Sequence, residues 1–277
     1  MKWLPITAVV IAAMIGRCAC GSHRHDPLRV VSYNIEHFPQ SERQVRGAFD
    51  EIEAVHANLI GAQEITDPAR FVIEARARLG STWSFLHDTW RVPNHHHIGL
   101  LYDTAAWILD RVVEHDEPRI GPRDHGVLEI RLLPRDRDAG TAVRVLVIHF
   151  HPTSEGRAIR ARQHAALARI AGAAVQTGDR VIVLGDFNAT EASDRDDLAE
   201  LARTAKLHWA TESLACTAFW IRADGCPRSR LDHVLMSMSP VDVAVHGACA
   251  REGCDWQASC PRDAHEVSDH CPISVDF

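Results

Sequence analysis

The sequence contains no internal repeat and no low-complexity tract, and no long Pro/Gly/Ser linker interrupts residues 28–277. Because domain boundaries usually fall in such linkers, their absence favours a single domain over this range. The whole chain has 277 residues, enough for one large domain or two small ones. Its 46% hydrophobic and 24% charged residues are typical of a packed globular protein.

No apolar run is long enough to span a bilayer comfortably, so we expect no transmembrane segment in the mature chain. The apolar run near the start, Trp3–Ile15, follows Lys2 and precedes small residues. This order is typical of a secretory signal peptide, which we place at residues 1–20. The protein is therefore expected to be secreted or periplasmic. The alternative is a lipid anchor at Cys18 or Cys20, as in a bacterial lipoprotein.

The sequence also lacks a Cys-x-x-Cys pair among the six cysteines that follow the leader, which argues against a zinc site there. All six lie in the last quarter of the chain, and their number is even, which in an exported protein indicates disulfides. Pairing of sequence neighbours is the simplest of the possible connectivities. It predicts the bonds Cys216–Cys226, Cys249–Cys254 and Cys260–Cys271.

The sequence has fewer basic residues than acidic ones, 30 lysines and arginines against 37 aspartates and glutamates. The formal net charge is −7, and removal of the leader with Lys2 and Arg17 makes it more negative. Such a surface does not favour tight, non-specific binding to a nucleic-acid backbone. It does not exclude a nuclease, because local arginines and a bound divalent cation can offset the average charge.

Helices and runs of consecutive strands alternate irregularly along the chain. Ser41-x-x-Gln44 is a capping-box pattern, and Asp67-Pro68 places a cap before a proline at the first helical position. Further helices are predicted at 155–175 and 194–205. Apolar, β-branched runs predict strands at 28–35, 59–65, 83–87, 98–102, 107–113, 127–133, 143–149, 180–187, 230–236, 241–246 and 272–277. The mixed order indicates an α+β fold of two packed sheets with helices outside.

One strand ends in a motif with chemical potential, Gly185-Asp186-Phe187-Asn188. Alternate residues of a strand share a face, so Asp186 and Asn188 are expected to point the same way. A carboxylate and a carboxamide side by side can activate a water and hold a phosphate oxygen, which suggests hydrolysis of a phosphate ester. A simple turn explains the four residues equally well when they are taken alone.

Several other predicted strands end in polar residues, and polar strand ends usually line a shared cleft. Besides the motif at 185–188, these positions are Asn34, Glu64, His149, Asp232, and the Asp269-His270 pair of Ser268-Asp269-His270. In this order, with Arg230-Leu231-Asp232 between the two most specific motifs, the set resembles the endonuclease/exonuclease/phosphatase superfamily. The resemblance covers roughly residues 28–277. It implies a four-layer αββα sandwich with the site at one end of the two sheets.

The resemblance also implies a metal site. Glu64 looks like the principal ligand, with Asn34 and Asp269 nearby. These oxygen donors suit Mg²⁺, or Mn²⁺, rather than zinc. A metal held there would polarise the phosphoryl oxygen and neutralise developing charge.

The remaining residues of the set take the other roles of the family. Asp186 would orient or deprotonate the attacking water, and Asn188 would donate a hydrogen bond to the phosphate. His270 would face the scissile phosphate as general base or as a charged stabiliser, with its ring held by Asp232. His149 would contact a phosphate oxygen. Two alternatives stay open: whether Asp186 or His270 takes the proton, and whether His151 replaces His149.

Three further features are interpreted without a catalytic role. His95-His96-His97 is read as a polar loop rather than a metal site. His265-Glu266-x-x-x-His270 has one residue too many for the zinc-protease helix pattern. The arginines of the long helix, at 157, 160 and 162, are expected to form a solvated face.

The sequence therefore predicts a secreted, Mg²⁺-dependent phosphodiesterase that acts as a monomer, with nucleic acid as the favoured substrate. A phospholipid such as sphingomyelin is the alternative, although no clear exposed aromatic hairpin of an interfacial enzyme is evident. The nearest feature is Phe219-Trp220, bracketed by Cys216 and Cys226. It is either a substrate-contacting loop or a buried anchor. A non-catalytic binding protein on the same fold ranks last, because none of the expected acids and histidines is missing.

Overall fold

The computed structural model describes residues 27–90, 95–136 and 140–277. The predicted leader, with Cys18 and Cys20, lies outside the described residues. No helix in the described ranges is both long and apolar enough to cross a membrane.

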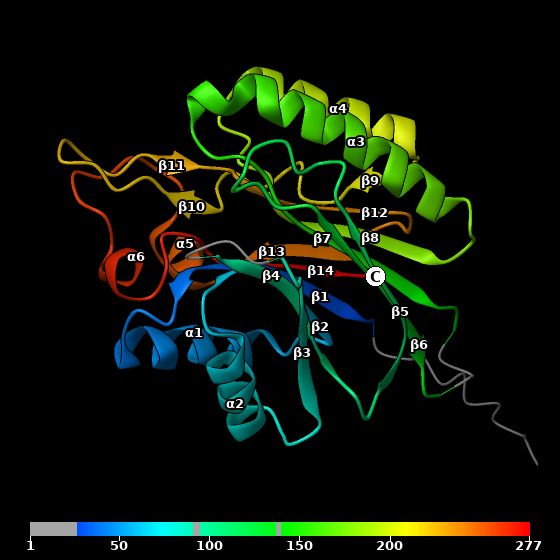
Figure 1. The fold of residues 1–277 in the computed structure, drawn as a ribbon. Coiled ribbons are helices and arrows are strands. Elements are labelled where there is room, and N and C mark those ends of the chain that lie inside the picture. Colours follow the sequence, from blue (N-terminus) through cyan, green and yellow to red (C-terminus); the bar gives the residue numbers. More distant parts are fainter. Residues whose placement is uncertain (1–26, 91–94, 137–139) are drawn as a thin grey trace, which may run out of the picture.

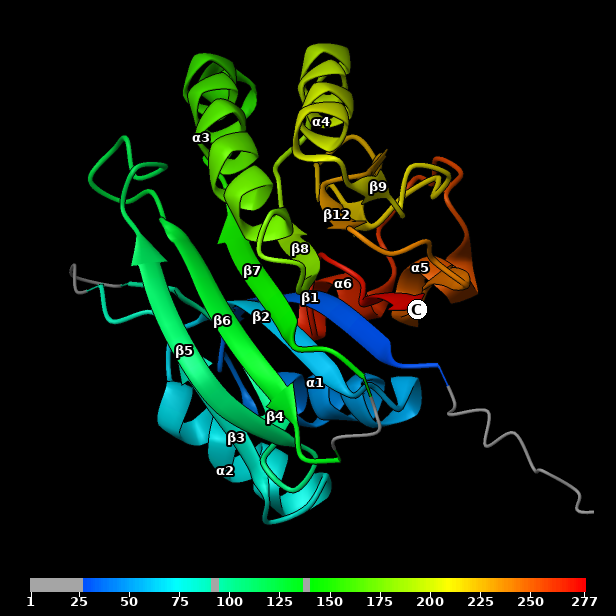
Figure 2. The ribbon, with the colours of Figure 1, turned by 90° about the vertical axis from the view of Figure 1, so that its right-hand side faces the viewer.

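Two six-stranded mixed sheets form the centre of the fold (Figures 1 and 2). The first has the order β13-β14-β1-β2-β4-β3, and the second the order β5-β6-β7-β8-β12-β9. The strands of the first sheet are β1 (Arg29–Phe38), β2 (Leu59–Ile65), β3 (Trp83–His87), β4 (His97–Asp103), β13 (Asp242–Val245) and β14 (Ile273–Asp276). Those of the second are β5 (Trp107–His115), β6 (Val127–Pro134), β7 (Val143–His149), β8 (Arg180–Asp186), β9 (His208–Trp209) and β12 (Asp232–Met236).

Helices cover both outer faces of the paired sheets. Helices α1 (Glu42–Val55) and α2 (Pro68–Arg78) lie on the first sheet, and α3 (Arg157–Val175) and α4 (Ala192–Ala205) lie on the second (Figure 2). Apolar side chains fill the space between the sheets, among them Leu59, Leu100, Val145, Leu184 and Val234. This arrangement confirms the predicted α+β class and the four-layer αββα sandwich.

Both predicted N-caps form, although the Gln44 side chain accepts a hydrogen bond from the Gln40 amide rather than from the Ser41 amide, as a full capping box would require. The Ser41 hydroxyl accepts a hydrogen bond from the Gln44 amide at 3.1 Å, and the Asp67 carboxylate accepts one from the Arg70 amide at 2.9 Å. The long helix begins slightly later than expected, because residues Ser154–Gly156 form a 3-10 turn before α3. Each cap stabilises its helix by about 1 kcal/mol.

The disulfide connectivity differs from the neighbour pairing, which is wrong at all three bonds. The bonds are Cys216–Cys254, Cys226–Cys260 and Cys249–Cys271. The reason is that the short hairpin of β10 (Ala218–Phe219) and β11 (Arg228–Ser229) lies against the segment that carries α5 (Gly247–Glu252) and α6 (Arg262–Glu266), at one end of the sandwich (Figure 1). Each of the first two bonds therefore joins the hairpin region to that later segment.

The long helix also departs from its predicted solvated face. Arg160 is fully buried and forms an ion pair with the buried Asp194 of α4, with Nη2 and Oδ2 2.8 Å apart. Arg157 pairs with Asp197 at 2.8 Å, and Arg162 is exposed as expected. The pairs join α3 to α4, so charge here holds two outer helices together.

One buried histidine gives the fold a sensitivity to acid. His164 on α3 packs against Phe150 and Phe187. Neither ring nitrogen has a hydrogen-bond partner among the described residues, and burial lowers the pKa of His164 to about 4. The unfolded chain, with a histidine pKa of about 6.5, binds the proton more readily, so stability falls as the pH drops from about 6.5 towards 4.

We therefore expect His164→Leu to reduce this acid sensitivity. Between pH 7.5 and pH 5, the free energy of unfolding should fall by about 2 kcal/mol less than in the wild type. Urea titrations at the two pH values measure it, with the exposed His208→Gln as the control. An equal fall in wild type and His164→Leu would contradict the assignment.

Candidate active site

The predicted residues gather at one end of the sandwich, contributed by both sheets. Asn34 and Glu64 lie on β1 and β2 of the first sheet. In the second sheet, the strand register pairs His149 of β7 with Asp186 of β8 and pairs Asp186 with Asp232 of β12. Three neighbouring strands thus carry three polar side chains at the same level.

Hydrogen bonds connect the two sheets at this point. The Asn34 side-chain amide donates to Glu64 Oε1 at 3.1 Å and to Asp186 Oδ2 at 3.2 Å. Asn34 and Asp186 are almost completely buried. Within the second sheet, Gly185, with φ of +145°, permits the close pairing of β8 with β7, because a Cβ there would lie 2.0 Å from the Ile148 carbonyl oxygen. A larger residue at 185 would therefore push β8 away from β7.

Asp186 and Asn188 are neighbours, but not through strand alternation. Strand β8 ends at Asp186, and Asn188 has a left-handed φ of +49°. This turn brings the Asn188 amide to Asp186 Oδ1 at 2.8 Å, while the Asn188 side chain donates to the Phe150 carbonyl at 2.9 Å. The motif is thus a turn, and this turn brings Asp186 and Asn188 together.

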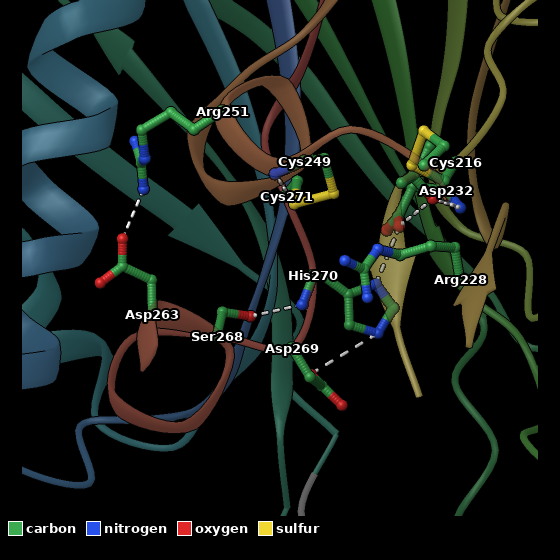
Figure 3. The surroundings of a disulfide bond; sticks show 12 residues. Cys216, Arg228, Asp232, Cys249, Arg251, Asp263, Ser268, Asp269, His270 and Cys271 are labelled. Atoms are coloured by element: carbon green, nitrogen blue, oxygen red, sulfur yellow. Dashed lines mark hydrogen bonds and ion pairs between the residues drawn. A yellow bond between two sulfur atoms is a disulfide. The ribbon is translucent and has the colours of Figure 1, made fainter. Parts of the chain in front are cut away.

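His270 is fixed by its surroundings (Figure 3). Its Nδ1 lies 2.8 Å from Asp232 Oδ2, and its Nε2 lies 3.7 Å from Asp186 Oδ2. Burial opposes the charge on the ring, but the carboxylates of Asp232, Asp186 and Asp269 together raise the His270 pKa well above its usual value. The arrangement confirms the predicted contact between Asp232 and the ring, and it leaves Nε2 facing the other acids.

Two hydroxyl groups that the sequence analysis left without a role support this pair. Thr217 donates from Oγ1 to Asp232 Oδ2 at 2.8 Å. Ser268 Oγ accepts from the His270 amide at 3.1 Å and donates to the Asn34 carbonyl at 2.8 Å. Ser268 lies inside the quoted Ser-Asp-His motif, whereas nothing near Thr217 in the sequence signals its contact.

The acids of the cleft carry more negative charge than their neighbours balance. Burial and the carboxylates of Glu64 and Asp186 raise the pKa of Asp269, and burial and Asp269 raise the pKa of Glu36. Among the described residues, no lysine or arginine forms an ion pair with any of these four acids. Oxygen donors with uncompensated charge suit a hard divalent cation, so the donor set fits the metal that the resemblance implies.

The structure places His149, rather than His151, beside these acids. His149 Nε2 lies 3.6 Å from Asp186 Oδ2 and 3.9 Å from Glu64 Oε1. His151 instead pairs with Asp124, with Nδ1 and Oδ1 2.6 Å apart.

The backbone around Glu64 is unusual. Glu36, His37 and Glu64 all have positive φ, at +32°, +57° and +61°. Such conformations are costly for residues other than glycine and cluster at functional sites. His37 donates its backbone amide to Glu64 Oε2 at 3.2 Å, and its ring Nε2 lies 3.3 Å from the same oxygen. The sequence analysis missed Glu36 and His37, since only the irregular pairing of β1 with β2 brings them to the cleft.

Comparisons with known structures agree with this fold. The D. rerio TDP2 complexed with single strand DNA product is 13% identical, with 90% of this chain and 98% of that chain covered and a TM-score of 0.65. The human Nocturnin catalytic domain is 17% identical, with coverages of 90% and 93% and a TM-score of 0.67. A Bacteroides thetaiotaomicron mannosyl-6-phosphatase is 16% identical, with coverages of 90% and 98% and a TM-score of 0.59.

A comparison with curated protein sequences finds no match. At these identities, the structural similarities show the fold alone. The model of the Endonuclease/Exonuclease/phosphatase family matches residues 31–270, nearly the whole of the described sandwich. The chain belongs to the endonuclease/exonuclease/phosphatase family.

Proposed function

We propose that this family member is a secreted, Mg²⁺-dependent phosphodiesterase that cleaves nucleic acid. The gathering of Asn34, Glu64, His149, Asp186, Asn188, Asp232, Asp269 and His270 at one end of the sandwich supports phosphoester hydrolysis. Strand β14 extends the paired sheet to Asp276, so we take the domain as residues 28–277. The three disulfides fit an oxidising compartment and therefore export of the protein. We take the protein to act as a monomer.

Glu64, Asn34 and Asp269 would hold the divalent cation, Mg²⁺ or Mn²⁺. When bound, this ion supplies charge neutralisation and polarisation at the phosphoryl oxygen. Asn34 would present its side-chain oxygen, Oδ1, which accepts a hydrogen bond from the Glu36 backbone amide at 3.1 Å in this structure.

The other side chains would act on the water and the phosphate. Asp186, anchored by donors at both oxygens, orients or deprotonates the attacking water. His270 faces the phosphate through Nε2, as a charged stabiliser or as the base, while Asp232 holds the ring through Nδ1. Asn188 and His149 contact phosphate oxygens and stabilise the charge that develops there.

One observation favours nucleic acid over smaller phosphoesters. A pocket of about 360 Å³, next to Asn188, is lined by Ala189 and Thr190 and by three arginines, Arg195, Arg228 and Arg230. Within the described chain, none of the three arginines has a carboxylate within ion-pair distance, although the protein is acidic overall. Burial lowers the pKa of Arg228 and of Arg230. Unpaired arginines beside a phosphate site are what a polymer with further phosphates needs.

We expect Arg195→Gln to weaken nucleic-acid binding without slowing the chemistry. Its KM for DNA should rise by about tenfold, equivalent to about 1.4 kcal/mol. The slope of log affinity against log salt should fall by about one, since one phosphate contact is lost. Arg203→Gln is the control, because Arg203 lies on the same helix and pairs with Glu200. An unchanged salt slope in Arg195→Gln would contradict phosphate binding in this pocket.

A phospholipid substrate has its own supporting observation. Phe219 is the buried anchor of the β10–β11 hairpin, but Trp220 is 60% exposed and Trp256, packed on Gly225 of the same hairpin, is 64% exposed. Ile221 is exposed beside them. The hairpin pairs with the catalytic segment, since Ala218 bridges to His270. Exposed tryptophans at one end of a cleft suit either a lipid interface or stacking of bases.

A substrate panel separates these functions. Mature protein with Mg²⁺ is offered plasmid DNA, RNA, sphingomyelin vesicles and bis-p-nitrophenyl phosphate. We expect cleavage of nucleic acid and of the small diester. Cleavage of lipid alone would overturn the nuclease proposal, and no cleavage with any divalent cation would overturn the enzymatic one.

A further inference from the structure

A second group of metal-binding side chains lies beside the cleft, outside the family motifs. Asp88 follows β3 and is 3% exposed. Its Oδ2 lies 2.7 Å from His95 Nε2 and 3.6 Å from His125 Nδ1, while its Oδ1 lies 2.8 Å from His97 Nδ1. Three imidazoles thus surround one carboxylate, and two of them come from the run that the sequence analysis read as a polar loop.

The hydrogen bonds of this group leave one potential metal-binding atom unused. His125 is buried, and within the described part of the chain its Nδ1 has no hydrogen-bond partner, although it lies 3.6 Å from Asp88 Oδ2. A buried imidazole nitrogen without a partner is costly unless something else satisfies it.

We propose that Asp88, His95 and His125 form a binding site for Zn²⁺. The three ligand atoms all lie within 4.8 Å of one another. Zn²⁺ binds imidazole nitrogen and carboxylate oxygen at roughly 2.0–2.2 Å, so a small outward movement of the side chains would admit it. Nitrogen donors set this site apart from the oxygen-rich cleft, which suits Mg²⁺.

His97 acts as the supporting residue of this site. It bonds to the second oxygen of Asp88 and also lies 3.1 Å from the Asp88 carbonyl oxygen through the same Nδ1. Such outer contacts orient a metal-bound carboxylate and tune its affinity. Three protein ligands leave one coordination position open for water or a substrate oxygen.

The position of the site gives it two consequences. Asp88 and His95 follow and precede strands of the first sheet, whereas His125 precedes β6 of the second, so a bound ion joins the two sheets. Asp88 and His95 also line a cavity of about 800 Å³ that includes Trp90. His125 stacks on His149 of the catalytic set, with ring centroids 5.2 Å apart and planes at 15°. The ion would therefore stand on the wall of the catalytic cleft.

Equilibrium dialysis of the untagged protein against Zn²⁺, with metal analysis, tests the proposal. We expect one zinc ion per chain that survives Glu64→Gln, and a loss of at least tenfold in affinity in Asp88→Asn, His95→Gln and His125→Gln. His115→Gln is the matched control, because His115 also contacts a carboxylate, that of Glu129 at 2.7 Å, but belongs to no group of three possible metal ligands in the residues that the structure describes. Zinc should raise the melting temperature of the wild type, of Glu64→Gln and of the His115→Gln control, but not of the three site variants.

Two results would overturn the site. One is zinc binding that Glu64→Gln removes and Asp88→Asn preserves, which would place the ion in the catalytic cleft. The other is no bound zinc in the wild type. If the variants fail to fold, anomalous diffraction at the zinc edge from wild-type crystals decides the matter, since the peak either lies among Asp88, His95 and His125 or it does not.

Discussion

Replacing Asp186 with asparagine should lower kcat for bis-p-nitrophenyl phosphate by about 10²- to 10⁴-fold, the usual contribution of a positioned acid or base. The change removes the charge and the proton-accepting ability of a carboxylate that lies 3.6 Å from His149 Nε2 and 3.7 Å from His270 Nε2. Steady-state kinetics with saturating Mg²⁺ measure the effect.

The asparagine is nearly the same size, so the fold should persist. Its carbonyl oxygen can still accept from the Asn188 amide, but its amide group would meet the Asn34 amide, two donors face to face. We expect a cost of about 1–3 kcal/mol in stability, which thermal melting separates from the loss of turnover. Asp242→Asn, at an exposed position of β13, is the control. Unchanged kcat in Asp186→Asn would remove this residue from the mechanism.

Glu64→Gln should abolish most activity by weakening the divalent site. We expect at least about a hundredfold loss of kcat/KM and a higher Mg²⁺ requirement, because the metal loses its principal anionic ligand. Burial opposes ionisation of Glu64, but His149 and the hydrogen bond from Asn34 together lower its pKa, so the native group is a carboxylate. Titration calorimetry with Mn²⁺ gives a direct measurement that does not depend on turnover.

Glutamine has nearly the same shape as glutamate and meets a similar cost at the left-handed φ of position 64, so the comparison isolates charge. Glu74→Gln, on α2 and paired with Arg70, is the matched control. If Glu64→Gln binds Mn²⁺ and cleaves substrate as the wild type does, the cation lies elsewhere and the proposed ligand set is wrong.

The strand and helix pattern made most of the fold predictable. Strands at 59–65, 83–87 and 143–149 have the predicted bounds, because each is a short segment dominated by apolar residues. The short elements were missed: β9, β10 and β11 have two residues each, and α5 and α6 have six and five. Elements of this size carry too few residues to show a period and are held by disulfides and tertiary contacts instead.

Local sequence motifs were enough to select the candidate site residues, but not the residues that surround them. Asn34, Asp186 and His270 could be selected because each stands at the end of a strand or in a specific motif. Glu36 and His37 reach the cleft because the pairing of β1 with β2 is irregular. The buried ion pair between Arg160 and Asp194 forms because helices α3 and α4 pack together. The pairing of the six cysteines and the grouping of three histidines around Asp88 likewise depend on which segments lie side by side in the fold. Sequence spacing contains none of that information.

The division of the proposed catalytic residues between two sheets has a consequence for how the protein can change. Neither sheet alone holds a working fragment: Asn34 and Glu64 belong to one, His149, Asp186 and Asp232 to the other. A loosely collapsed chain with intact strands would contain every required side chain and still lack the geometry. Turnover thus reports on the docking of the two sheets. Selection for activity is therefore also selection for a rigid interface between the two sheets. The solvent faces of the outer helices can accept substitutions more freely.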